Sequence, residues 1–168
     1  ASFFNCLGVE VTVIEMLDEI LGGMDKELSA MLRAEYAKRG IKFMLNTKVV
    51  SLDGSAGENG ETQVRVNYEN AEGTGFSVAE KLLMSVGRRP VTKGFGLENL
   101  NPEKTERGNI RVDGQMRTSV PGVYACGDLT GFSLLAHTAV REAEVAVHAV
   151  LGKKDCMSYR AIPGVVYT

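Results

Sequence analysis

The chain has 168 residues, of which 44% are hydrophobic, 24% charged and 7% aromatic, which fits one or two globular domains and excludes disorder as the main state. Its 19 basic and 21 acidic residues leave a net charge of −2, and without a basic run nothing supports a nucleic-acid surface. No apolar stretch reaches the roughly 20 residues that span a bilayer, and three scattered cysteines indicate a reducing compartment, so we expect a soluble cytoplasmic protein.

The first quarter of the chain predicts a strand, a helix and a second strand. Residues Ser2–Leu7, followed by a glycine, are typical of the last turns of a helix. Val9–Glu15 predicts a buried strand, Asp25 can cap a helix that ends at Gly40, and Ile41–Leu45 predicts the next strand. The helix carries apolar residues at helical spacing: Leu28, Met31, Leu32 and Tyr36. A connection of this kind pairs the strands in parallel and indicates an α/β architecture.

Further along, Thr62–Val86 alternates apolar and polar residues around a glycine-containing turn and predicts an antiparallel hairpin or meander. Two short strands are predicted at Ile110–Val112 and Val123–Cys126, and a helix at about Leu134–Leu151. The apolar side of this helix is expected to comprise Leu135, Ala139, Ala143, Ala146, Val147 and Val150. Residues 1–86 carry 8 basic and 13 acidic side chains and residues 87–168 carry 11 and 8, which suggests two unlike segments joined near Gly87.

Glu15 lies at the carboxyl end of the first predicted strand. In a dinucleotide-binding fold an acid at this place accepts hydrogen bonds from the adenosine ribose hydroxyls, and its charge would repel a 2′-phosphate, so NAD is favoured over NADP. A strand-terminal glutamate is more often only a solvated end. The glycine-rich turn that should precede this strand is absent, so we expect either another fold or a truncated chain, and truncation explains more.

The most specific pattern is Thr118–Asp128, in which a turn and a short apolar strand lead to Gly127 and Asp128 and then to a helix. Gly127 lets a cofactor approach the backbone, and the carboxylate of Asp128 can bind a polyol hydroxyl. The free N–H groups of the helix start suit the electron-rich atoms of a flavin ring. His137, in the first turn of that helix, is interpreted as a wall of the cofactor site and not as a proton carrier.

The segment Gly87-Arg88-Arg89-Pro90 places an unhindered backbone and two cations at a strand end, where dinucleotide phosphates or hydroxyls could bind. Its simpler interpretation is a basic turn. Five segments, taken together, resemble the pyridine nucleotide-disulfide oxidoreductases in order and spacing, and within that family the dihydrolipoamide dehydrogenases. They are Val11–Glu15, Leu45–Val49, Val86–Pro90, Tyr124–Asp128 and Leu134–His137.

The resemblance implies a Rossmann-like FAD/NAD(P)-binding fold, with residues 1–86 as an NAD domain that lacks its first strand and residues 87–168 as the C-terminal part of an FAD domain. Glu15 would bind the adenosine ribose, Val49 would contact adenine through its backbone, and Gly87 would lie against the nicotinamide half. Asp128 would hold the flavin ribityl chain. The residues implied to line the flavin ring are Leu134, Leu135, Ala136 and His137.

The implied activity is the oxidation of dihydrolipoyl groups of 2-oxo acid dehydrogenase complexes through a protein disulfide, FAD and NAD, by a homodimer. The chain contains no redox-active C-x-x-x-x-C and no His-Glu base pair of the family, so we expect the 168 residues alone to be an inactive fragment with poor FAD affinity. Two alternatives stay open: another flavoprotein disulfide reductase or NADH oxidase, or a non-catalytic nucleotide-binding module.

Overall fold

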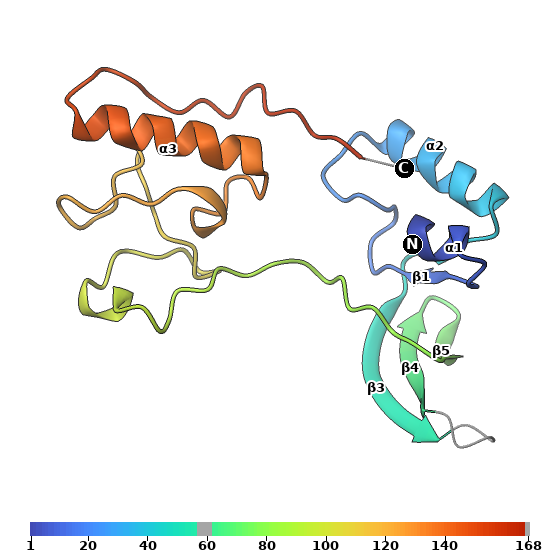
Figure 1. Ribbon diagram of the computed structural model, residues 1–168. Helices are drawn as coiled ribbons and strands as arrows, with labels where there is room; N and C mark the ends of the chain where they lie inside the picture. The colour runs from blue at the N-terminus through green and yellow to red at the C-terminus, as the bar shows by residue number, and fades with distance from the viewer. Residues whose placement is uncertain (57–61, 167–168) are drawn as a thin grey trace. The chain divides into compact units, whose positions relative to one another are not determined.

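The computed structural model describes residues 1–56 and 62–166 (Figure 1). It divides into two compact units, one formed by Ala1–Met84 with the last residues from Gly164, and the other by Ser85–Pro163. Among the described residues, no helix combines the length and the apolar character needed to cross a membrane.

The first unit begins with the predicted strand, helix and strand. Helix α1 (Ser2–Cys6) precedes strand β1 (Thr12–Ile14), which pairs in parallel with β2 (Lys42–Met44), and helix α2 (Lys26–Lys38) connects the two strands. The side chain of Asp25 accepts hydrogen bonds from the N–H groups of Glu27 and Leu28 at 2.9 and 3.2 Å, so the predicted cap of α2 is confirmed.

The predicted buried face of α2 is only partly right. Tyr36 is buried and Leu32 is half-buried, but Leu28 and Met31 are each about 60% exposed. Ser29 is buried instead, where its hydroxyl donates to the backbone oxygen of Asp25 at 2.9 Å. A small polar residue that bonds within its own helix can face the interior at little cost, because its polar group is satisfied.

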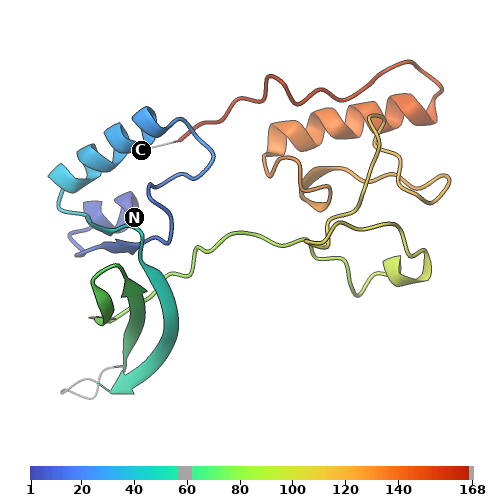
Figure 2. The ribbon, with the colours of Figure 1, turned by 180° about the vertical axis from the view of Figure 1, so that it is seen from behind.

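The rest of this unit is a three-stranded antiparallel sheet in the order β3 (Lys48–Ala56), β4 (Thr62–Asn70) and β5 (Gly73–Ala79) (Figures 1 and 2). The predicted hairpin is confirmed for β4 and β5, while β3 adds a strand that the sequence did not indicate. The prediction that Lys81–Val86 continues the hairpin is wrong, because among the described residues this segment pairs with no other strand.

The second unit is organised around helix α3 (Ala136–Val150). The short strands predicted at 110–112 and 123–126 are wrong as strands: the chain makes only isolated antiparallel bridges there, Lys104 with Ile110 and Arg117 with Tyr124. The remaining elements are two single-turn 3-10 helices, η1 (Leu97–Asn99) and η2 (Gly127–Leu129).

The face that α3 buries differs from the predicted one. Thr138, Glu142, Val145 and Ala149 are buried, whereas Val147 and Val150 of the predicted apolar side are exposed. After α3 the chain turns and runs back along the helix (Figures 1 and 2). Helix α3 therefore lies between η2 and this returning segment, and its buried face carries a carboxylate.

Candidate functional site

The first candidate site lies where β1 and β2 end. The N–H of Glu15 donates to the backbone oxygen of Met44, and its own oxygen accepts from the N–H of Thr47, both at 2.9 Å. The carboxylate Oε1 of Glu15 accepts from the N–H of Leu17 at 3.0 Å. Glu15 is thus held at the carboxyl end of the parallel pair, with its side chain folded against the following turn.

Val49 lies close to this strand end, although it is far from Glu15 in sequence. It follows Thr47 by two residues, is the second residue of β3, pairs with Tyr68 and is 43% exposed. Because the N–H of Thr47 donates to Glu15, the two residues predicted to contact the adenosine half of NAD lie at the same edge of this unit.

The loop after β1 is fixed to α2 by an ion pair that sequence patterns did not indicate. The guanidinium of Arg33 donates to both carboxylate oxygens of Glu19, with Nε–Oε1 and Nη2–Oε2 distances of 2.8 and 3.0 Å. Hydrogen bonding from Arg33 lowers the pKa of the Glu19 carboxyl. This bidentate pair orients the chain immediately beyond Glu15.

The second candidate site lies in the other unit, where Arg88 reaches Asp128. The Nε and Nη2 atoms of Arg88 donate to Oδ2 of Asp128 at 3.2 and 2.9 Å. Gly87 precedes this arginine with a φ of +101°, a left-handed conformation that glycine adopts without strain, and its surroundings are open. The ion pair therefore brings the predicted nicotinamide-side residue Gly87 and the predicted ribityl-binding residue Asp128 to one place.

The start of α3 lies in the same unit as the Arg88–Asp128 pair. Leu135 is the N-cap in an extended conformation, and among the described residues no side chain caps the helix there. The four residues predicted to line the flavin ring are all exposed: Leu134, Leu135, Ala136 and His137. The N–H groups of Ala136 and His137 bond to nothing in the part of the chain that the structure describes, so the helix presents free donors and the positive end of its dipole.

Glu142 connects the Asp128 turn to α3, and no motif in the sequence singled it out. Its side chain is fully buried. Oε2 accepts from the N–H of Gly127 at 2.5 Å, and Oε1 accepts from the hydroxyl of Tyr159 at 2.7 Å. Burial and this hydrogen bond raise the pKa of Tyr159, and burial followed by the charge of Glu142 raises the pKa of the neighbouring Cys126 thiol.

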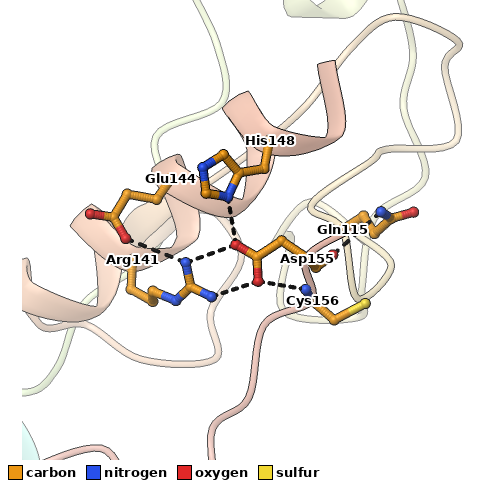
Figure 3. A network of polar contacts seen from close by, with 6 residues as sticks. All are labelled: Gln115, Arg141, Glu144, His148, Asp155 and Cys156. Atoms are coloured by element: carbon orange, nitrogen blue, oxygen red, sulfur yellow. Dashed lines mark hydrogen bonds and ion pairs between the residues drawn. The ribbon is translucent and has the colours of Figure 1, made fainter. Parts of the chain in front are cut away.

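A second polar network holds the returning segment to the far half of α3 (Figure 3). The carboxylate of Asp155 accepts from Nη1 and Nη2 of Arg141 at 2.9 and 2.6 Å, and lies 2.7 Å from Nδ1 of His148. It also accepts from the N–H of Cys156 at 2.8 Å. These contacts, Arg141 first, hold the pKa of Asp155 far below its usual range. The network fixes the returning segment, which also carries Tyr159.

Comparisons with known proteins match both units of the chain. A family model described as pyridine nucleotide-disulphide oxidoreductase matches residues 1–143. The dihydrolipoyl dehydrogenase of Chlamydia pneumoniae is 39% identical to the chain over 100% of the chain and 34% of its own length. The dihydrolipoyl dehydrogenase of Thermus scotoductus is 41% identical over 98% of the chain and 35% of its own length. The chain thus spans about a third of the curated relatives it matches.

Solved structures confirm the predicted α/β, Rossmann-like fold class. LpdA from Mycobacterium tuberculosis matches 98% of this chain, and 34% of its own, with a TM-score of 0.83 at 29% identity. An FAD-dependent pyridine nucleotide-disulphide oxidoreductase from Desulfovibrio vulgaris matches 89% of this chain, and 38% of its own, with a TM-score of 0.67 at 30% identity. With its family model covering most of its length, the chain belongs to the pyridine nucleotide-disulphide oxidoreductase family.

Proposed function

We propose that this chain supplies the NAD-binding and flavin ribityl-binding parts of a dihydrolipoyl dehydrogenase. The observation that carries the proposal is the turn at Gly127 and Asp128, which packs on α3 and offers a carboxylate in the same unit as the uncapped start of that helix. The relatives named dihydrolipoyl dehydrogenase support the substrate class. Residues 1–86 would serve NAD and residues 87–168 would serve FAD.

The residues of the second unit fit part of an FAD molecule. Asp128 is half-buried, and among the described residues its Oδ1 accepts no hydrogen bond, so a ribityl hydroxyl can donate to it. The free N–H groups of Ala136 and His137 suit the electron-rich edge of the flavin ring, and the exposed Leu134 and Leu135 suit its apolar surface. FAD, when bound, supplies the electron transfer between a dithiol and NAD.

The residues of the first unit fit an adenosine ribose. Oε1 of Glu15 is occupied by the N–H of Leu17, while Oε2 has no partner among the described residues and can accept from a ribose hydroxyl. The residues that follow, Met16, Leu17 and Asp18, offer no cation to a 2′-phosphate. Val49 would add a backbone contact to adenine. A carboxylate at Glu15 with no neighbouring cation accepts from a ribose hydroxyl but repels a 2′-phosphate, so NAD is favoured over NADP.

The wider biochemical role follows from the same proposal. The electron relay would need a redox-active disulfide and a proton acceptor from outside these 168 residues, because no C-x-x-x-x-C is present in them. The substrate would then be the dihydrolipoyl group of a lipoyl domain, and the enzyme a cytoplasmic homodimer that serves 2-oxo acid dehydrogenase complexes. The alternatives are another flavoprotein disulfide reductase, an NADH oxidase, or a nucleotide-binding module without catalysis.

Coenzyme titration tests the binding part of this proposal. Calorimetric titration of the 168-residue chain with NAD, NADP and FAD is expected to give binding of NAD that is stronger than that of NADP, together with weak FAD binding. Preference for NADP would contradict the role of Glu15. Absence of FAD binding, even at millimolar concentration, would contradict the role of Asp128 and of the α3 start.

A chimera tests the activity. The matching third of the Thermus scotoductus relative would be replaced by this chain, and the purified chimera would be assayed with dihydrolipoamide, glutathione disulfide and oxygen. NAD-dependent oxidation of dihydrolipoamide is expected. A folded, flavin-loaded chimera that acts only on glutathione disulfide or oxygen would favour one of the other redox enzymes, and one that fails to retain flavin would favour the non-catalytic module.

A further inference from the structure

Glu142 is a buried carboxylate with a specific set of partners, and neither the sequence motifs nor the binding residues proposed above account for it. Its side chain is fully buried in the second unit. Both of its oxygens accept hydrogen bonds: Oε2 from the N–H of Gly127, and Oε1 from the hydroxyl of Tyr159 and, at 3.4 Å, from that of Thr130. A carboxyl group is costly to bury unless its oxygens are hydrogen-bonded, and here both of them are.

The bond to Gly127 fixes the residue that immediately precedes Asp128. Gly127 has a φ of +73°, and a Cβ there would lie 3.3 Å from the Cβ of Ala139 on α3. The turn thus approaches the helix closely enough for its backbone N–H to reach a side chain of the helix. The hydroxyl of Thr130, at the end of the same turn, donates to the backbone oxygen of Gly127 at 3.0 Å and closes the turn.

Because Glu142 belongs to α3, it sets the position of Asp128 relative to the start of that helix. We infer that Glu142 is a positioning residue: through the Gly127 N–H it holds Asp128 and the first turn of α3 in one geometry, and Tyr159 of the returning segment holds Glu142 in turn. The stacking of Tyr159 on Phe132, at 4.8 Å between ring centroids, orients the tyrosine from the loop between η2 and α3. The flavin-related part of this inference rests on the proposed function.

The first experiment needs no flavin. In the 168-residue chain, Glu142→Met keeps a side chain of similar size but removes both acceptors. NMR is expected to show an upfield shift and faster solvent exchange of the Gly127 N–H, together with faster exchange of the Arg88 Nε–H, because Asp128 moves. Glu142→Gln should restore part of both signals. Glu144→Met is the matched control on the exposed side of α3 and should change neither.

A folded Glu142→Met variant in which the Gly127 and Arg88 signals stay as in the parent chain would overturn the inference. If that variant does not fold, Tyr159→Phe decides. It removes one donor from Glu142 and leaves the donors Gly127 and Thr130. The bond from Gly127 should then strengthen and its N–H signal should move downfield, opposite to the shift expected for Glu142→Met. An unchanged or upfield signal would refute the inference.

The second experiment asks whether Glu142 acts through Asp128. Loss of a positioned hydrogen bond is expected to weaken FAD binding roughly tenfold in Glu142→Met, measured by NMR titration. In an Asp128→Ala background the same change should have little further effect. An equal loss in both backgrounds would mean that Glu142 does not act through Asp128. If the parent chain binds no FAD, the flavin part of the proposed function fails, while the flavin-free experiment still decides the role of Glu142.

Discussion

Replacing Gly127 with alanine tests how closely the Asp128 turn must approach α3. The variant would keep a non-glycine residue at a φ of +73°, which costs roughly 1–2 kcal/mol. Its new Cβ would lie 3.3 Å from the Cβ of Ala139, so the turn or the helix must also move apart by a few tenths of an ångström. That movement lengthens the Gly127–Glu142 bond without breaking it and should cost about 1 kcal/mol, part of the roughly 1.5–3 kcal/mol that a hydrogen bond to a charged group contributes. The expected destabilisation is therefore about 2–3 kcal/mol.

Gly122→Ala is the matched control. Gly122 has nearly the same φ, +78°, in a turn closed by the bond from Val123 to Val120, and a Cβ there would meet nothing within 4 Å. Each glycine-to-alanine change lowers the conformational entropy of the unfolded chain and thereby favours folding. This stabilisation is equal in the two variants and cancels when they are compared. The difference of about 1 kcal/mol between the two variants isolates the contact with α3.

Hydrogen exchange of α3 amides, such as that of the buried Val145, reports the stability of the second unit separately from the first. We expect Gly127→Ala to lower protection of these amides more than Gly122→Ala does. In a thermal melt of the second unit, the expected difference of about 1 kcal/mol between the two variants corresponds to a melting temperature lower by about 4–8 °C for Gly127→Ala than for Gly122→Ala. Equal destabilisation by the two variants would refute the argument that the turn is held close to α3.

Three further predictions concern other parts of the chain. Glu15→Arg should shift the ratio of NAD to NADP affinity at least about tenfold toward NADP. Glu10→Arg makes the same charge change at an exposed site and should leave the ratio unchanged. If calorimetric titration gives the Glu15→Arg variant the same ratio as the parent chain, Glu15 does not bind the ribose. Asp155 has a lowered pKa in the folded chain, so its stabilisation is present above the usual aspartate pKa of about 3.9 and is lost as pH falls below it. Urea midpoints of the chain and of Asp155→Asn should therefore converge in acid, and a constant gap would contradict the ion pair. Asp25→Ala should destabilise α2 by about 1 kcal/mol, while Asp25→Asn should retain the cap; equal urea midpoints for Asp25→Ala and the parent chain would mean that the cap contributes nothing.

Local signals in the sequence predicted the elements whose determinants lie close together in the chain. The cap at Asp25 and the left-handed glycine at position 40 determine where α2 starts and ends. The β-branched run before Glu15 and the short run after Gly40 then have one way to pair, because the helix between them is long enough for a parallel connection. The place of Glu15 at the strand end follows from these features alone.

Strand β3 escaped prediction because its pairing is irregular. The register with β4 shifts between Val49 and Ser51, so the neighbouring valines Val49 and Val50 interrupt the alternation that identifies a strand. The opposite error occurred at 81–86, where an apolar run resembles a strand but has no partner among the described residues. A strand is defined by its neighbour, which a single segment of sequence does not contain.

Helix α3 shows why the positioning residue was not predicted. Its apolar pattern points to the side with Val147 and Val150, but the contacts within the second unit are made by the side with Glu142 and Val145. A charged residue in the middle of a helix is normally assigned to solvent. Only the three-dimensional arrangement brings the N–H of Gly127 and the hydroxyl of Tyr159 to that carboxylate.

The two proposed hydroxyl-binding carboxylates share one arrangement, which leads to a last prediction. Glu15 uses one oxygen for the N–H of Leu17, and Asp128 uses one for Arg88. An internal bond to one oxygen orients the carboxylate before a ligand arrives and leaves the other oxygen as acceptor, which lowers the entropy lost on binding.

Arg88→Met should therefore weaken FAD binding to the chain. The ion pair with Asp128 is exposed, so the expected loss is about two- to fivefold, corresponding to less than about 1 kcal/mol. Arg89→Met, the neighbouring exposed arginine, is the control and should leave the affinity unchanged. Tighter FAD binding by Arg88→Met would refute the argument, because it would mean that Arg88 competes with the ribityl hydroxyl for Asp128 instead of orienting it.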